Sequence, residues 1–419
     1  MNQIIKFLNK REFLKNSLIL ITGTTVAQVI PVVLSPVISR LFNSEDFAVF
    51  GLFFSIAGVI SGIAAGTYEF AIVLPKKDAD AKNLLVLSVL ILFFTVILSF
   101  LLFILFKTHI AALLNNTHIT KWLLLVPLSV FFITFNSIIG FWFNRKKDYG
   151  VISMNKIIRN GTTAFGNILL GFIKLFKGGL IVGQVIGDFV STLVLSNRLL
   201  QNKILSTEIT KANITKVASG YKKFPIFTLP NTLLSTFSYQ LPILLISAWF
   251  TPSITGSYFF SSRILAIPVA LIGAAISQVF YQKFAEIINE RIHDAKKFLI
   301  KIWAILFAIG IIPFGLLFFF GKVLFGFFFG PEWITAGEIS ALLAPMILFM
   351  FISSPTSSTY LVLGKQNVNV FFGIATFIYR PLAIYIGYLN HDLFLGLKIL
   401  VIVEIVEVIL YNLVIFRYL

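Results

Sequence analysis

The 419-residue chain contains no cysteine, so it has no disulfide framework, no thiolate nucleophile and no cysteine-ligated metal. Charged residues make up only 12% of it, against roughly 25% in soluble domains, which excludes a soluble globular protein. Its four histidines lack metal-ligand spacing, and no G-x-x-x-x-G-K-[ST] phosphate loop occurs, so we expect no metal, no cofactor and no ATP hydrolysis.

Apolar residues make up 58% of the chain and gather in runs of about 20, the length needed to cross a bilayer as a helix. This pattern predicts an all-α polytopic membrane protein with twelve transmembrane helices. The first run contains Pro31 and Pro36 and lacks a small-residue cleavage site, so it is expected to be a retained helix rather than a signal peptide. The predicted spans are 14–39, 47–74, 84–106, 122–143, 157–176, 180–200, 224–250, 257–282, 298–320, 339–363, 368–389 and 394–416.

The positive charge follows the predicted topology. Of the 34 Lys and Arg residues, 24 lie in segments on the same side as the N-terminus, six in the opposite loops and four inside spans. Cytoplasmic loops are enriched in Lys and Arg, so both termini are predicted to be cytoplasmic. The net charge of +17 is therefore read as a mark of topology, with attraction to membrane lipids as a secondary effect, and no nucleic acid partner is expected.

The segment 204–223 divides the map into an N-terminal six-helix lobe, 1–203, and a C-terminal six-helix lobe, 224–419. The first and seventh spans are the most polar and proline-interrupted ones, and they hold matching places in the two lobes. Such matching helices point to the central pathway of a transporter. The alternative is that their Ser and Thr residues satisfy backbone groups that proline leaves free within a packed bundle.

Two glycine ladders occur in the second and sixth spans. They predict close helix packing within a lobe. They consist of Gly58, Gly62 and Gly66, and of Gly179, Gly183 and Gly187.

Three ordered blocks of sequence resemble the Wzx-type O-antigen and oligosaccharide flippases. The first runs from Ile38 to Lys77, with Glu45-Asp46-Phe47 and Tyr68-Glu69-Phe70. The second runs from Tyr221 through Leu229-Pro230-Asn231 to Arg263, and the third holds Gly330-Pro331-Glu332-Trp333, Leu343-Ala344-Pro345 and Ser354-Pro355. Together they span both lobes in order.

The resemblance implies the fold of the multidrug/oligosaccharidyl-lipid/polysaccharide exporter superfamily, with a MATE-like central cavity lined by helices 1, 2, 7 and 8 and an alternating-access mechanism. It implies transfer of an undecaprenyl-pyrophosphate oligosaccharide from the cytoplasmic to the periplasmic leaflet of a bacterial inner membrane, for O-antigen and lipopolysaccharide biosynthesis. A polysaccharide polymerase and a chain-length regulator are the partners expected with it.

Cations and amides on the expected pathway helices are the candidate substrate-binding groups. Arg263 lies in the eighth span, where a guanidinium offers forked donors to a pyrophosphate; its alternative role is a bond to carbonyls freed by Pro268. Arg40 has Glu45 and Asp46 within reach and favours an interfacial ion pair, and Lys398 could simply extend to the interface. The full set of candidates is Arg263, Arg40, Gln28, Asn231, Gln240, Arg380 and Lys398.

Three carboxylates inside spans are candidates for proton coupling, because an ionisable side chain there needs a partner or water. Glu404 lies at the depth of Arg380, which predicts a structural ion pair. Glu69 is expected near Arg159, with release of that partner during the cycle as the functional alternative. Asp188 has no depth-matched cation in its own lobe by this map.

Two rival functions share part of this pattern. A MATE-like efflux transporter of cationic drugs would present acidic and aromatic groups to its cavity, whereas the candidates here are mainly cationic. A membrane-embedded glycan polymerase or ligase needs catalytic carboxylates or histidines with room for two substrates, and no predicted outer loop exceeds about 18 residues. A non-enzymatic flippase is therefore the leading prediction.

Overall fold

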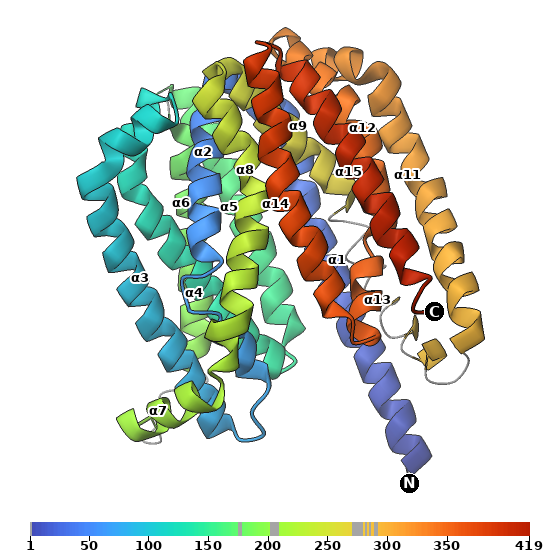
Figure 1. Cartoon of the computed structure of the whole chain (residues 1–419). Helices are drawn as coiled ribbons and strands as arrows, with labels where there is room; N and C mark the ends of the chain where they lie inside the picture. The colour runs from blue at the N-terminus through green and yellow to red at the C-terminus, as the bar shows by residue number, and fades with distance from the viewer. Residues whose placement is uncertain are drawn as a thin grey trace. The chain divides into compact units, whose positions relative to one another are not determined.

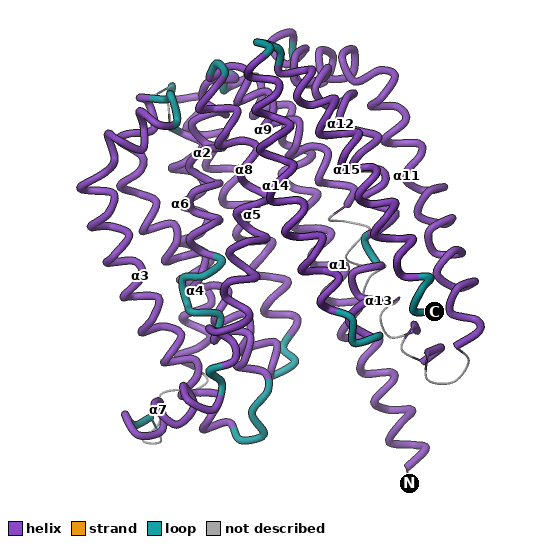
Figure 2. The backbone as a smooth tube through the Cα atoms, in the orientation of Figure 1, coloured by secondary structure: helices purple, strands orange, loops and turns teal. Residues whose placement is uncertain are grey.

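The computed structural model describes residues 2–174, 178–201, 209–269, 280, 283–284, 286–288 and 292–419. Over these residues it is helical, with no strand, and short loops join the helices (Figure 2). Each predicted span overlaps a described helix, and eight helices are long and apolar enough to cross a membrane. The chain is thus an all-α polytopic membrane protein, while the count of twelve spans stays a prediction.

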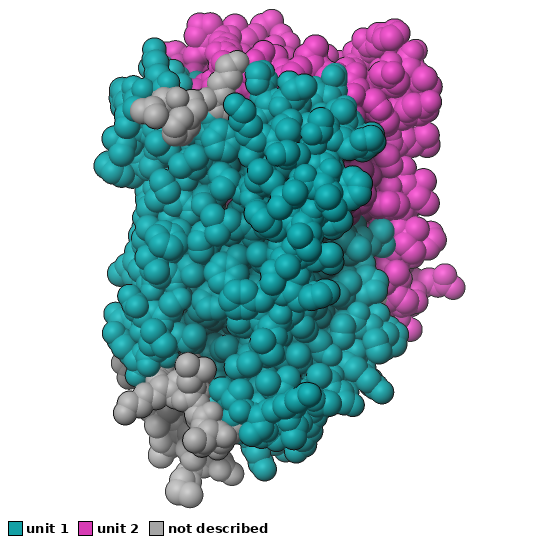
Figure 3. Space-filling view, turned by 90° about the vertical axis from the view of Figure 1, so that its left-hand side faces the viewer, with its two compact units in different colours: residues 1–41, 52–236 teal, residues 42–51, 237–419 magenta. Residues whose placement is uncertain are grey.

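The internal contacts divide the chain into two compact units (Figure 3). Unit 1 comprises 1–41 and 52–236, and unit 2 comprises 42–51 and 237–419. The division therefore falls inside two helices, α2 and α8. The first turns of α2 belong to unit 2 and the first turns of α8 to unit 1.

Unit 1 contains the helices of the first half of the chain, and in it the N-terminus and α7 lie at the same end (Figure 1). Its main helices are α1 (Asn2–Leu41), most of α2 (Ser44–Ser61), α3 (Asp78–Leu113), α4 (Val126–Arg145), α5 (Tyr149–Ile173), α6 (Gly179–Gln201) and α7 (Lys211–Gly220). The 3-10 helices η1 (Tyr68–Val73) and η2 (Thr117–Leu125), the π-helical turn η3 (Phe224–Thr228) and the start of α8 (Leu229–Trp249) complete it.

The second predicted span is a shorter helix than expected. The α-helix α2 ends at Ser61 instead of continuing to residue 74, and the 3-10 helix η1 follows it. Gly66 and Thr67 have φ of +65° and +59°, the left-handed conformation that ends a helix and that glycine adopts without strain. Gly66 therefore lies in the turn between α2 and η1, and the first glycine ladder does not run along one continuous helix.

The second glycine ladder does allow close packing, as expected. A Cβ at Gly183 would lie 2.0 Å from the Asn167 side chain, and one at Gly187 would lie 2.9 Å from the backbone oxygen of Arg159. Helices α5 and α6 can approach this closely only because these positions carry no side chain. This approach brings Arg159 of α5 and Asp188 of α6 together.

Unit 2 contains the helices of the second half of the chain. They are most of α8, then α9 (Pro252–Pro268), α11 (Ile292–Phe329), η5 (Pro331–Trp333), α12 (Ile334–Ser353), α13 (Thr356–Val362), α14 (Gln366–Leu389) and α15 (Leu393–Ile415). Buried Leu265, Leu343, Ile384 and Leu397 join α9, α12, α14 and α15 in one apolar core. The rest of the predicted eighth span, 270–279, lies outside the described residues.

Candidate functional site

Proline frees carbonyl groups in α1 and α8, and side chains of the same unit satisfy them. Pro31 removes the donor for the Ala27 carbonyl, and the Asn160 amide of α5 donates to that oxygen over 2.6 Å. Pro36 does the same to the Val32 carbonyl, to which the Ser35 hydroxyl donates over 2.6 Å. Ser35 of α1 and Asn160 of α5 thus compensate for proline, which was the alternative to a cavity-lining role for such polar residues.

The same arrangement occurs in unit 2 with a charged donor. Pro242 frees the Ser238 carbonyl in α8, and Arg380 Nη1 of α14 donates to it over 3.2 Å. The other guanidinium nitrogens make a forked pair with Glu404 of α15, one bond being Nε to Oε2 at 3.1 Å. The expected Arg380–Glu404 pair is therefore present. Both side chains are nearly buried, at 13% and 3% exposed, so the pair and the carbonyl hold three helices together.

Unit 1 contains a corresponding ion pair, whose partners the sequence analysis did not predict correctly. Arg159 of α5 pairs through Nε with Asp188 of α6, whose side chain is fully buried. Arg159 was expected beside Glu69, and Asp188 was expected to have no cation within its lobe; the structure corrects both. In each half of the chain an arginine from the fifth predicted span pairs with an acid of the sixth.

A polar network surrounds the Arg159–Asp188 pair. Gln184 Nε2 donates to Asp188 Oδ1 over 3.1 Å, and the Asn136 amide donates to Thr192 over 2.7 Å. The second carboxylate oxygen of Asp188 is buried and has no hydrogen-bond partner among the described residues. This network joins α4, α5 and α6 and accounts for Asp188 structurally.

Arg263 differs from the other two intramembrane arginines. It is half-buried on α9 with its guanidinium carbon 5.3 Å from the centre of the Phe50 ring, a cation–π contact within unit 2. No described residue forms an ion pair with it. It also makes no described hydrogen bond to the Ile264 carbonyl that Pro268 frees, so the expected structural alternative is absent. Its forked donors are available to an anion.

The other predicted binding residues are spread over the two units. The side-chain amide oxygen of Gln28 in α1, Oε1, is buried and has no hydrogen-bond partner in the described chain. Asn231 is exposed on the first turns of α8, and Gln240 is half-buried further along it. Arg40 is exposed at the end of α1, and Lys398 is exposed on α15. Among these residues, Gln28 is the one whose amide oxygen calls for a ligand or water.

Sequence reasoning missed Lys156. It was counted in a cytoplasmic loop, but α5 begins at Tyr149, so Lys156 lies two turns inside the helix. Its ammonium donates to the Thr24 hydroxyl of α1 over 3.2 Å, and no described carboxylate pairs with it. Arg159 follows one turn later, so α5 carries two cations, of which Lys156 contacts α1 and Arg159 contacts α6. The start of the helical pattern at Tyr149, after the Asp148 cap, could have indicated this.

Glu69 and Glu407 are carboxylates inside predicted spans that form no ion pair among the described residues. Glu69 in η1 is 3% exposed, forms no described ion pair, and its Oε2 has no hydrogen-bond partner in the described part of the chain. Glu407, one turn after Glu404, lies 3.5 Å from the Tyr379 hydroxyl, while the guanidinium of Arg380 is taken by Glu404. Glu69 thus keeps its place as a proton-coupling candidate, whereas Asp188 and Glu404 each have an arginine partner.

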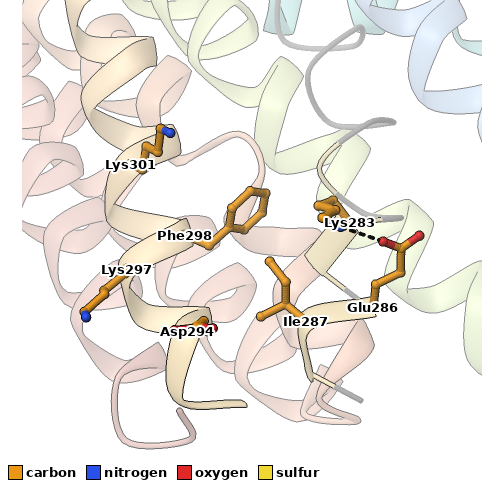
Figure 4. A pocket seen from close by; sticks show the side chains of 7 residues that line it. All are labelled: Lys283, Glu286, Ile287, Asp294, Lys297, Phe298 and Lys301. Atoms are coloured by element: carbon orange, nitrogen blue, oxygen red, sulfur yellow. Dashed lines mark hydrogen bonds and ion pairs between the residues drawn. The ribbon is translucent and has the colours of Figure 1, made fainter. Parts of the chain in front are cut away.

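A pocket of about 450 Å³ in unit 2 lies between the start of α11 and the residues Lys283, Glu286 and Ile287. Its wall carries Lys283 paired with Glu286 at 2.9 Å, and Lys297 and Phe298 from α11 (Figure 4). None of the predicted binding residues lines it. Its charged groups lie in the segment 283–301, which is predicted to be cytoplasmic.

This chain is similar to one family model and to several solved structures. The family model described as "Polysaccharide biosynthesis protein" matches residues 37–338. Among solved structures, an inward-facing MATE family multidrug transporter is 13% identical, with a TM-score of 0.73 over 95% of this chain and 94% of that one. The lipid II flippase MurJ in an inward closed conformation is 17% identical, with a TM-score of 0.73 over 96% of this chain and 87% of that one.

A transporter of the MOP superfamily from Pyrococcus furiosus is also similar. It is 14% identical, with a TM-score of 0.68 over 96% of this chain and 95% of that one. A search of curated protein sequences gives no match. At these identities the structural likeness shows the fold alone, which this chain shares with the MATE family transporter and with the flippase MurJ. The chain belongs to the polysaccharide biosynthesis protein family, whose model covers most of it.

Proposed function

We propose that this protein is a flippase that moves an undecaprenyl-pyrophosphate-linked oligosaccharide from the cytoplasmic to the periplasmic leaflet of a bacterial inner membrane by alternating access. The observation that carries the proposal is the match to the polysaccharide biosynthesis family over residues 37–338 together with an unpaired guanidinium at Arg263. A pyrophosphate offers pairs of acceptor oxygens, which the planar, forked guanidinium of an arginine can bind in a bidentate way.

The distribution of charge favours this substrate over a cationic drug. Arg263 and Lys156 have no carboxylate partner in the described chain, whereas two of the buried acids, Asp188 and Glu404, are held by arginines, and the third, Glu69, is the proton-coupling candidate. An unpaired cation in a membrane protein calls for an anionic ligand, because a charge without a counter-ion is costly there. In this proposal Gln28, Asn231 and Gln240 bind the sugars, and Arg40, Arg380 and Lys398 are secondary contacts.

Deleting the gene tests the substrate class. A strain that lacks this protein and any second flippase should accumulate lipid-linked repeat units on the cytoplasmic side and lose the surface glycan, which the resemblance implies is O-antigen. The readouts are glycan extraction from the cell surface and leaflet-specific labelling of the lipid-linked sugar. Unchanged glycan with increased susceptibility to cationic drugs would favour an efflux transporter instead.

The energy source is proposed to be the proton gradient, with Glu69 as the group that gains and loses a proton. Glu69→Gln keeps the shape and removes the charge change, so flipping should fall and should no longer differ between vesicles with and without a proton gradient. Glu286→Gln, which changes an exposed acid in unit 2, should flip like the unmodified protein. A Glu69→Gln protein that responds to the gradient as the unmodified one does would exclude this assignment.

A further inference from the structure

The Gly330-Pro331-Glu332-Trp333 segment between α11 and α12 has a contact that the substrate site does not explain. Glu332 Oε1 accepts hydrogen bonds from the Ser44 backbone N–H over 2.8 Å and from the Ser44 hydroxyl over 3.2 Å. Ser44 is the first residue of α2, 288 positions away in the chain. The carboxylate thus caps the positive end of a helix from a distant segment, where an anion is stabilising.

Aromatic packing continues this contact on the apolar face of the first two turns of α2. The Phe47 ring lies 5.0 Å from Phe260 and 4.9 Å from Trp333, between ring centres. Trp333 is fully buried and lies 4.2 Å from Phe260. A Cβ at Gly256 would fall 1.7 Å from the Ser44 carbonyl oxygen, so only glycine allows α9 to approach α2 this closely.

The contact involves a helix, α2, that is divided between the two compact units. Residues 42–51, which include Ser44 and Phe47, belong to unit 2, and the remainder of the same helix belongs to unit 1. Arg40 near the end of α1 and Lys322 in α11 precede Ser44 and Glu332 in the sequence, and both were counted among the residues predicted to lie on the outer side. The contact therefore ties the outer end of a helix of the first lobe to the second lobe's unit.

The polar bonds of this contact are weak enough to break and form again. Glu332 and Ser253 are exposed, and the Ser253 hydroxyl lies 2.9 Å from that of Ser44, so water can replace these polar bonds. A hydrogen bond to a charged group contributes about 1.5–3 kcal/mol. States separated by a few kcal/mol exchange during a functional cycle.

We infer that Glu332 and Trp333 form a releasable latch on the start of α2, which must open at the outer side once in each transport cycle. The inference rests on the proposed flippase function for its role and on the Ser44–Glu332 geometry for its existence. The natural absence of cysteine makes both parts testable with introduced thiols.

The first experiment locks the latch. The Ser44 and Ser253 oxygens lie 2.9 Å apart, so Ser44→Cys/Ser253→Cys can form a disulfide without large movement. Oxidation should lower flipping at least about tenfold, because a barrier raised by about 1.4 kcal/mol already gives that factor, and a reductant should restore it. Each single variant should flip normally.

A matched cross-link tests whether joining two helices of unit 2 is itself harmful. Lys322 and Glu338 form an exposed pair at 2.7 Å between α11 and α12. Lys322→Cys/Glu338→Cys joined by a short bifunctional thiol reagent should flip normally. Normal flipping by the oxidised Ser44→Cys/Ser253→Cys protein would show that the contact is permanent and overturn the inference, while the flippase function would stand.

The second experiment needs no substrate. Ser44 is 4% exposed, so a thiol placed there should react slowly with a membrane-impermeant maleimide. Adding Glu332→Gln weakens the cap and should raise that labelling rate several-fold, whereas adding Glu338→Gln should leave it unchanged. Equal rates in the two double variants would overturn the latch. A raised rate in a protein that moves no lipid-linked sugar would leave the latch standing and reject the proposed function.

Discussion

Arg263→Ala should lower flipping of lipid-linked oligosaccharide by about 10- to 100-fold, since charge-assisted hydrogen bonds contribute about 1.5–3 kcal/mol. Arg263 has no carboxylate partner in the described chain and contacts only the Phe50 ring by its charge, so its removal breaks no ion pair. The amount of protein in the membrane should therefore change little. The measurement is the initial flipping rate per folded protein in vesicles.

Two control variants show whether the effect of Arg263→Ala comes from the lost charge, from the lost guanidinium geometry, or from removing any positive charge of unit 2. Arg263→Lys keeps the charge and loses the fork, so an intermediate rate is expected. Lys297→Ala removes one positive charge from the pocket of Figure 4, away from the predicted binding residues, and should flip normally. An Arg263→Ala protein with the normal rate would mean that another group binds the anion.

Arg380→Ala should destabilise the folded protein by about 3–5 kcal/mol, the usual cost of removing one partner of a buried pair. The change leaves Glu404, 3% exposed, without its cation and the Pro242-freed Ser238 carbonyl without its donor. Less protein should accumulate in the membrane, and thermal unfolding in detergent should occur at a lower temperature.

The double replacement Arg380→Met/Glu404→Met distinguishes an unpaired charge from lost packing. Because it removes both charges, it should recover most of the stability that Arg380→Ala loses. Lys322→Ala breaks an exposed pair and should cost at most about 1 kcal/mol. If Arg380→Ala unfolds at the same temperature as the unmodified protein, the pair does not hold α8, α14 and α15 together.

Features that depend on hydropathy and depth were predictable from the sequence. The apolar runs locate the helices, and counting residues from the cytoplasmic end placed Arg380 and Glu404 at one level, where the structure has them bonded. Proline positions also indicated which carbonyls need donors. The sequence does not say which neighbouring helix supplies them, so Asn160 and Arg380 in this role emerged only from the structure.

Two kinds of feature could not be predicted: the residue at which a helix begins, and the packing of one end of a helix in the other compact unit. Helix α5 begins at Tyr149, eight residues before the apolar run, because its first turns are polar but still helical. Arg159 and Lys156 therefore lie deeper along that helix than the apolar run indicated, beside Asp188 and Thr24. Hydropathy also does not indicate which unit the end of a helix packs in. The assignment of residues 42–51 to unit 2 therefore could not be predicted from the hydropathy pattern.

Reconstitution of the purified protein in liposomes tests the central claim most directly. Undecaprenyl-pyrophosphate oligosaccharide is placed in one leaflet, and its appearance in the other is followed with a membrane-impermeant sugar-oxidising or sugar-cleaving reagent. The account predicts rapid, protein-dependent transfer that the Arg263→Ala protein slows and that the Lys297→Ala protein does not. Transfer at the rate of protein-free liposomes by the folded, unmodified protein under an imposed proton gradient would contradict it.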